Sequence, residues 1–188
     1  MDESDDDDLM ARVAGGDRKA FAVLVQRHLD RVVATAERIL VNRPDAEDVA
    51  QDALLRLWRH APRWHAGRAR LSTWLYRVTV NLCLDRRRHP KMQALDDVPE
   101  PVDPGTDGFA SVHRSQTARR VGAALAGLPP RQRAALALCH YQGLSQAEAA
   151  SVLDVSVKSV ESLLVRARRQ LRGTLAELVE NNRSGIPS

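Results

Sequence analysis

Short polar and basic side chains recur on one face of a predicted helix near the C-terminus, over residues 156–172. This segment carries five basic residues and one acid. Short polar residues at a helix N-terminus can approach the edges of bases, and arginine binds guanine edges or phosphates. The outward-facing set is predicted to be Lys158, Ser159, Glu161, Ser162, Val165, Arg166 and Arg169. The pattern favours a surface that reads duplex DNA, while a solvated basic face on an ordinary helix pair would give the same pattern.

A second basic segment, over residues 63–88, holds seven arginines and one acid. Trp74 lies beside a helix face that is predicted to hold Arg77, Asn81 and Arg88. An unstacked base can stack on an aromatic ring while its phosphates pair with arginine, so this surface suits separated strands. Asparagine is a poor helix former, which indicates a hydrogen-bonding task for Asn81. Core packing of Trp74 is an alternative that stays open. The preference of helix C-termini for positive charge also applies to Arg86–Arg88 and does not compete with strand binding.

The helix predicted over residues 45–59 carries a different surface. An exposed leucine between acidic residues fits a protein partner better than it fits DNA. Acidic residues in a first turn also complement the helix dipole, which explains Asp48 but not Leu55. The side chains on this surface are Asp48, Gln51, Asp52 and Leu55, followed by Arg56 and Arg59.

The sequence offers no catalytic or metal-binding constellation. Its six histidines form no H-x-x-x-H pair and do not combine with Cys83 or Cys139 at the spacing of metal ligands. It contains neither a glycine-rich phosphate loop nor a G-x-S-x-G motif. We therefore expect a protein that is not an enzyme and that needs no cofactor or metal.

These surfaces must be positioned by helices. Aromatic residues make up only 4% of the 188 residues, and no run alternates strictly between apolar and polar residues, so the fold class is predicted to be all-α. We expect two small helical domains joined by a flexible linker, the second a helix-turn-helix domain. The predicted divisions are an acidic, disordered tip over 1–8, a helical domain over 9–89, a linker over 90–112, a helix-turn-helix domain over 113–180 and a disordered tail over 181–188.

Local signals set the predicted helix boundaries. Asp17 is a cap for a helix over 18–41, and four prolines exclude a helix from the linker. Ser145 and Glu148 have the spacing of a capping box, and Ser156 begins the last long helix, which is predicted to end near Val179. Between the last two helices, Asp154 occupies a turn position where glycine is common, and aspartate tolerates left-handed geometry.

The net charge indicates the kind of partner, and the cysteine content indicates the cellular compartment. The net charge is +4, but the tip holds six acids, so the rest of the chain carries +10 and favours a polyanionic partner. Cys83 and Cys139 both lie in apolar helical patterns, which is typical of buried free thiols in a reducing compartment. With no signal peptide and no apolar stretch long enough to cross a bilayer, we expect a cytoplasmic protein without membrane insertion.

Three stretches, in order, resemble bacterial RNA polymerase sigma factors of the extracytoplasmic-function group. They are "DAEDVAQDALLRLWRH", "ARLSTWLYRVTVNLCLDRRRH" and "LPPRQRAALALCHYQGLSQAEAASVLDVSVKSVESLLVRARRQL". The resemblance covers residues 9–175. It implies a factor that binds core RNA polymerase and promoter DNA, helps to melt specific promoters, and is held inactive by an anti-sigma factor, with a stress-response regulon as its target.

The resemblance also assigns roles to residues. Asp48, Gln51, Asp52 and Leu55 would bind the polymerase. The residues that would read and open the minus-ten element are Arg68, Arg70, Trp74, Tyr76, Arg77, Asn81 and Arg88. The outward face of the last helix would read the minus-thirty-five element in the major groove. Glu161 stands where relatives often carry a base, which bears on the upstream sequence preference.

Two other functions compete with this interpretation. A stand-alone helix-turn-helix regulator would bind duplex DNA without polymerase, but it would need to dimerise to read half-sites, and the sequence offers no extra dimerisation helix. An all-helical adaptor that binds only proteins would leave the basic recognition helix unexplained.

Overall fold

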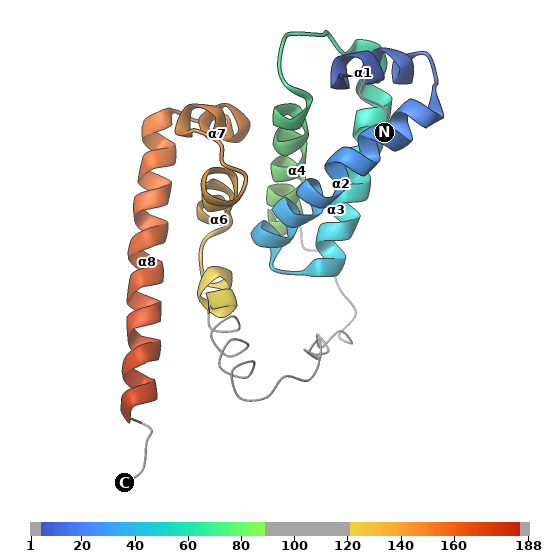
Figure 1. The fold of residues 1–188 in the computed structure, drawn as a ribbon. Helices are drawn as coiled ribbons and strands as arrows, with labels where there is room; N and C mark the ends of the chain where they lie inside the picture. The colour runs from blue at the N-terminus through green and yellow to red at the C-terminus, as the bar shows by residue number, and fades with distance from the viewer. Residues whose placement is uncertain (1–4, 89–120, 185–188) are drawn as a thin grey trace.

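The computed structural model describes residues 5–88 and 121–184, and every element in those two ranges is helical. The first domain contains α1 (Asp6–Ala14), α2 (Arg18–Leu40), α3 (Arg43–His60), the short 3-10 helix η1 (Ala61–Arg63) and α4 (Leu71–Arg88). The second contains helical residues 121–126, α6 (Pro130–Leu136), the π-helix η2 (Ala137–Tyr141), α7 (Gln146–Leu153) and α8 (Val157–Ser184) (Figure 1). The prediction of an all-α protein is confirmed, while the predicted linker over 90–112 lies outside the described residues.

Helix starts follow the predicted capping residues. The side chain of Asp17 accepts hydrogen bonds from the backbone N–H groups of Lys19 and Ala20 and so begins α2. The bond from Ala20 is the largest cause of a lowered pKa for this carboxyl. Asn42 caps α3 through the N–H of Asp45, and the helix begins at Arg43, two residues before the predicted start at residue 45. These caps satisfy N–H groups that a helix terminus would otherwise leave unpaired.

Within the acidic tip predicted over residues 1–8, residues 5–8 belong to a capped helix rather than to a disordered segment, and residues 1–4 lie outside the described residues. Asp5 caps α1, and the first turn of that helix consists of Asp6, Asp7 and Asp8. Asp6 accepts hydrogen bonds from Arg27 at 3.1 Å and from His28 at 2.8 Å, both on α2. The apolar side of α1 is buried in the domain, and these pairs hold its acidic end in place. Sequence spacing gave no sign of partners 21 and 22 residues away.

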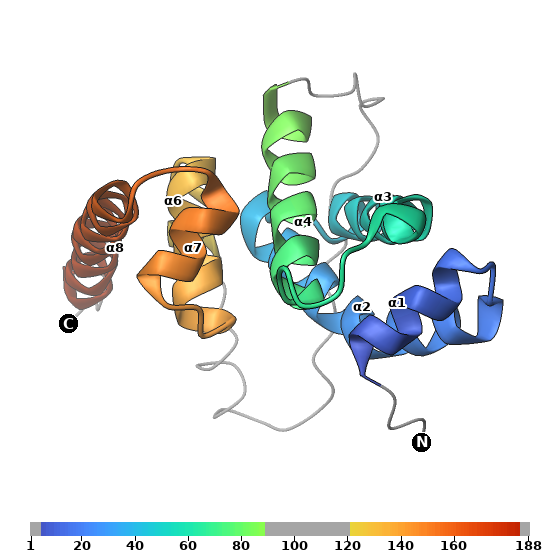
Figure 2. The same cartoon turned by 90° about the horizontal axis from the view of Figure 1, so that it is seen from above.

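The core of the first domain forms where α2, α3 and α4 meet (Figures 1 and 2). Leu24, Leu57 and Leu75 come from these three helices and are essentially inaccessible to solvent. Burying a side chain of this size contributes about 1.5–3 kcal/mol, so this meeting point fixes the direction of α4. The face of α4 that holds Arg77 and Asn81 is thereby turned away from the domain core and is exposed.

The second domain is stacked against the first. In Figure 2, α6 and α7 lie between α8 on one side and α4 on the other. One apolar cluster runs through both domains and includes Ile39 and Val80 of the first domain together with Leu138 and Val152 of the second. Helix α8 continues to Ser184, beyond the predicted end near 179 and into the range expected to be a disordered tail.

Candidate nucleic-acid and partner interfaces

The helix-turn-helix is built by α7, a tight turn and the start of α8. Ser145 and Glu148 form the predicted capping box, with each side chain bonded to the backbone N–H of the other. The Glu148 carboxylate accepts hydrogen bonds from the backbone N–H and from the hydroxyl of Ser145, and these two bonds are the largest causes of its lowered pKa. Asp154 adopts the left-handed conformation with φ 53° and ψ 52°, which turns the chain from α7 into α8. Val160 and Leu164 are buried beneath the turn, so the predicted helix-turn-helix is confirmed.

The outward face of α8 is open to solvent. Ser156 caps the helix through the N–H of Ser159, and Val165 is 56% exposed. A shallow hollow of about 440 Å³ lies beside this face and is also lined by Arg131 of α6. Sequence reasoning missed Arg131, because nothing in its local pattern connects it with a helix 25 residues later. The exposed members of the predicted set are Lys158, Ser159, Glu161, Ser162, Val165, Arg166 and Arg169.

The residues expected to handle separated strands divide into two groups. Arg68 and Arg70 are exposed at the loop before α4, close to a half-buried Trp74. The indole of Trp74 is stacked on His60 with ring centroids 4.8 Å apart, and it meets the ring of Trp64 edge-on at 6.4 Å. Core packing therefore accounts for part of the burial of Trp74, and Trp64 of the basic segment before α4 belongs to the same aromatic group.

The second group faces the other domain. Tyr76 is buried, and its hydroxyl donates a hydrogen bond of 2.9 Å to Gln142. Burial is the largest cause of a raised pKa for Tyr76. Arg77 is exposed and lies 3.7 Å from the carboxylate of Asp154 at the helix-turn-helix turn. Asn81 is exposed, whereas the side chain of Arg88 lies outside the described residues. In this arrangement the second domain covers Tyr76.

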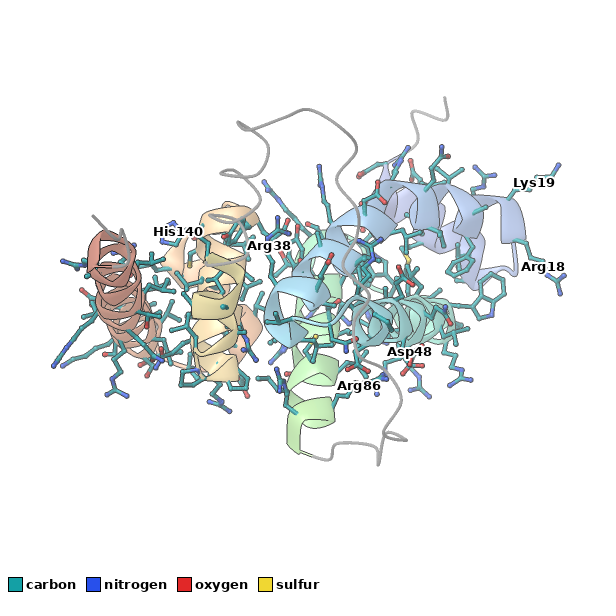
Figure 3. All side chains as sticks on the ribbon, turned by 90° about the horizontal axis from the view of Figure 1, so that it is seen from below. Arg18, Lys19, Arg38, Asp48, Arg86 and His140 are labelled. Atoms are coloured by element: carbon teal, nitrogen blue, oxygen red, sulfur yellow. The ribbon has the colours of Figure 1, made fainter. Side chains whose placement is uncertain are left out.

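Further contacts join the domains beside Tyr76. Gln142 also donates to the hydroxyl of the buried Thr35 at 2.9 Å, which brings α2 into the same network. The guanidinium of Arg38 lies 4.2 Å from the centroid of the Tyr141 ring, at cation–π distance. Arg38 on α2 and His140 on η2 can be located in Figure 3. The π-helix thus places its last residue, and the residue after it, against the first domain.

The acidic-leucine surface of α3 is exposed as predicted. Leu55 is 51% exposed, which is high for a large apolar side chain. Asp48 is not isolated, because Arg86 of α4 contacts it at 2.8 Å and contacts Asp45 at 2.7 Å (Figure 3). Sequence reasoning missed this pairing across 38 residues. The exposed residues of this surface are Asp48, Gln51, Asp52 and Leu55.

Neither a metal site nor a membrane-spanning helix is found in the part of the chain that the structure describes. Residues 5–88 and 121–184 contain no group of three or more histidine, cysteine, aspartate or glutamate side chains placed to hold a metal ion. Within the same ranges, no helix combines the length and the apolar character needed to cross a bilayer.

Comparison with known proteins places both domains in one family. The model for sigma-70 region 2 matches residues 24–91, and the model for sigma-70 region 4 matches residues 118–171. The chain is 38% identical over 174 residues to the ECF RNA polymerase sigma factor SigE of Mycolicibacterium smegmatis, covering 87% of this chain but 66% of that protein. It is 38% identical over 176 residues to the ECF RNA polymerase sigma factor SigM of Mycobacterium tuberculosis, covering 94% of this chain and 87% of that protein. Among solved structures, CnrH in complex with the cytosolic domain of CnrY matches with a TM-score of 0.68 and 30% identity, covering 92% of this chain and 97% of that one.

Proposed function

The chain belongs to the extracytoplasmic-function group of sigma-70 RNA polymerase sigma factors, and we propose that it directs transcription initiation by binding core polymerase and reading two promoter elements. The observation that carries the proposal is the presence, on two separate domains, of a basic helix-turn-helix face and a basic aromatic surface. Duplex recognition needs the first and strand separation needs the second. We place this activity in the cytoplasm.

Three surfaces divide the work. The exposed face of α8, with Arg166 near its centre, would enter the major groove of the minus-thirty-five element. The loop before α4 and the aromatic group beneath it would hold the melted minus-ten strand, with Arg68 and Arg70 toward its phosphates. The surface of α3 that includes Asp52 and Leu55 would bind the polymerase, since an exposed leucine among acids suits a protein partner.

Promoter binding in this scheme requires the two domains to separate. Tyr76 is buried against the second domain, so it reaches DNA only after that domain has left α4, a movement that also breaks the contact between Arg77 and Asp154. The 23 residues of the predicted linker would span at most about 75 Å when extended, which leaves room for that movement. The CnrH structure includes a bound partner, the cytosolic domain of CnrY. We propose that an anti-sigma factor similarly binds this chain and keeps it from polymerase.

The rival function, a stand-alone helix-turn-helix regulator, is not favoured. A region 2 domain precedes the helix-turn-helix domain, and such a regulator would have no use for it. The direct test is to mix the purified chain with core polymerase, isolate the complex by gel filtration and map start sites by run-off transcription. Co-elution and promoter-specific starts are expected. A chain that binds duplex DNA but neither co-elutes nor directs initiation would contradict the proposal.

A further inference from the structure

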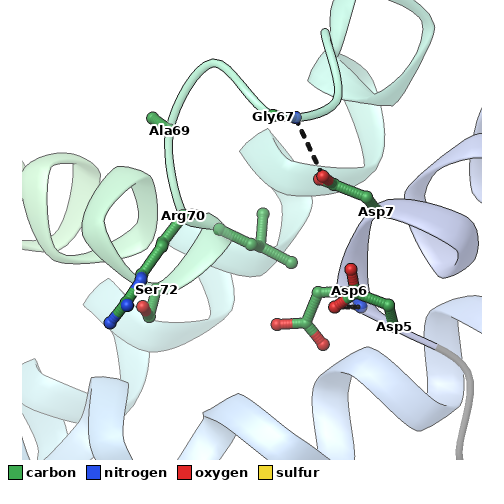
Figure 4. Close-up of a pocket in the computed structure, with 8 residues that line it drawn as sticks. Asp5, Asp6, Asp7, Gly67, Ala69, Arg70 and Ser72 are labelled. Atoms are coloured by element: carbon green, nitrogen blue, oxygen red, sulfur yellow. Dashed lines mark hydrogen bonds between the residues drawn. The ribbon is translucent and has the colours of Figure 1, made fainter.

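The first turn of α1 is bonded to the loop that precedes α4. One carboxylate oxygen of Asp7 accepts a hydrogen bond of 2.8 Å from the indole N–H of Trp64. The other accepts a bond of 2.9 Å from the backbone N–H of Gly67, drawn as the dashed line in Figure 4. A single side chain thus uses both of its oxygens to hold a segment about 60 residues further along the chain.

The segment that Asp7 holds is part of the proposed minus-ten surface. Trp64 meets the ring of Trp74 edge-on, so fixing Trp64 also fixes one neighbour of the ring expected to take a base. Gly67 has a φ of +73°, a backbone conformation that side-chain-bearing residues rarely adopt. Arg68 is the residue after Gly67, and Arg70 follows two positions later. The path of the loop, and the direction of its arginines, therefore depends on an anchor at Gly67.

A pocket of about 550 Å³ opens between this loop and the start of α1 (Figure 4). Its volume falls within the range of small-molecule sites, and its walls come from the acidic turn and from the first residues of α4. Arg70, Leu71 and Ser72 line one side, and Asp5, Asp6 and Asp7 line the other. Any shift of α1 relative to the loop changes the shape of this pocket.

The geometry requires a carboxylate at position 7. Two N–H donors point at its two oxygens, and an amide in its place would turn an NH₂ group toward one of them. Asp6 serves a different purpose, since its oxygens pair with Arg27 and His28 and fix α1 on α2. Asp8 is exposed, which makes it a matched control for a change of charge alone.

We propose that Asp7 is a positioning residue for promoter recognition. It holds the loop over residues 64–70 in the conformation that discriminates among bases of the melted minus-ten strand. The acidic turn of α1, which lies outside the region 2 match at residues 24–91, is then a determinant of promoter selectivity. The inference rests on the proposed function, because it assumes that this loop contacts the strand.

The test uses the full chain bound to core polymerase, and a panel of single-stranded minus-ten oligonucleotides that differ by one base. The sequence is taken from the promoter that the wild-type protein selects. In Asp7→Asn we expect the preference for the best base over the worst base, measured as the ratio of the two affinities, to fall about tenfold. A tenfold change corresponds to the loss of one charged hydrogen bond. Affinity for the upstream duplex should not change. Asp8→Asn should match the wild type in both measurements, and Asp7→Glu should restore part of the selectivity.

A spectroscopic measurement separates positioning from general damage. The indole N–H resonance of Trp64 should move in Asp7→Asn and stay in place in Asp8→Asn. If Asp7→Asn fails to fold, the base selectivity of Gly67→Ala is measured in its place as the deciding variant. The added Cβ of that variant meets no atom within 4 Å, but it strains the loop at positive φ. Equal selectivity in the deciding variant and the wild type, or an unmoved Trp64 resonance in Asp7→Asn, would overturn the inference. A wild-type complex that shows no base preference would instead count against the proposed function.

Discussion

The hydroxyl of Tyr76 donates a hydrogen bond of 2.9 Å to the side-chain oxygen of Gln142, joining α4 of the first domain to the second domain. The amide nitrogen of the same Gln142 donates to Thr35 of α2, also at 2.9 Å. One glutamine, the residue that follows η2, therefore connects the second domain with two helices of the first domain. Tyr76 and Thr35 are buried, so opening the domains breaks two sheltered bonds at once.

Replacing this glutamine should loosen the closed arrangement. Gln142→Leu removes both bonds and leaves the Tyr76 hydroxyl buried without its acceptor, at a cost of about 1–3 kcal/mol. We expect small-angle scattering to show a larger radius of gyration for this variant than for the wild type. Gln146→Leu, at an exposed position on α7, is the control. The same radius for Gln142→Leu and the wild type would mean that this network does not hold the domains together.

Arg86 should be a stability determinant of the first domain. Its guanidinium contacts Asp45 and Asp48 at once, and only 19% of its side chain is exposed. Arg86→Met keeps the apolar stem but leaves the two carboxylates without their cation. We expect the free energy of unfolding in urea to fall by about 1–3 kcal/mol. Arg56→Met removes an exposed charge from α3 and should change that free energy by less than about 0.5 kcal/mol.

Arg166 should contribute to upstream recognition. It is exposed on α8 and lines the hollow beside the helix-turn-helix. Arg166→Ala should weaken binding of the minus-thirty-five duplex by about 1–3 kcal/mol if the contact is to a base edge. Arg18→Ala makes the same change of charge on the opposite side of the molecule (Figure 3) and should have little effect on this duplex. Equal losses in the two variants would point to net charge and remove Arg166 from the reading face.

The buried thiol of Cys83 should make the free energy of unfolding fall as the pH becomes strongly alkaline. Burial raises the pKa of its thiol from an ordinary value near 9 to about 12. The thiol form is favoured in the folded state, so its contribution is complete below pH 9 and is lost as pH rises toward 12. That contribution amounts to at most about 4 kcal/mol. Unfolding measured from pH 8 to 11 should show a steeper loss of stability for the wild type than for Cys83→Ala. Parallel curves would contradict this expectation.

The helix caps and the turn could be predicted from the sequence, because they depend on residues that are close together in the chain. The caps at Asp17 and Ser145 depend on residues two or three positions away, so their spacing is visible without a structure. The same holds for Asp154, because a break between two amphipathic patterns demands a turn. The exposure of the predicted faces of α3 and α8 also follows from helical periodicity alone. What each surface binds stays a prediction from resemblance and charge.

The long-range contacts could not be read in this way. The acids at positions 6 and 7 look like part of a solvated charge run, and only the fold brings them to His28, Trp64 and Gly67. Tyr76 has the composition of a nucleic-acid contact, yet its partner lies 66 residues away in the other domain. Side-chain periodicity reports which face of a helix is buried but not which neighbour covers it.

The apolar cluster shared by the two domains makes their association sensitive to temperature. Separating them would expose part of this cluster, which includes Ile39, Val80, Leu138 and Val152, to water. Hydration of apolar surface raises the heat capacity, and the attraction between such surfaces fades as water is cooled. The closed form should therefore loosen in the cold, so that temperature by itself shifts the fraction of molecules whose strand-binding surface is uncovered.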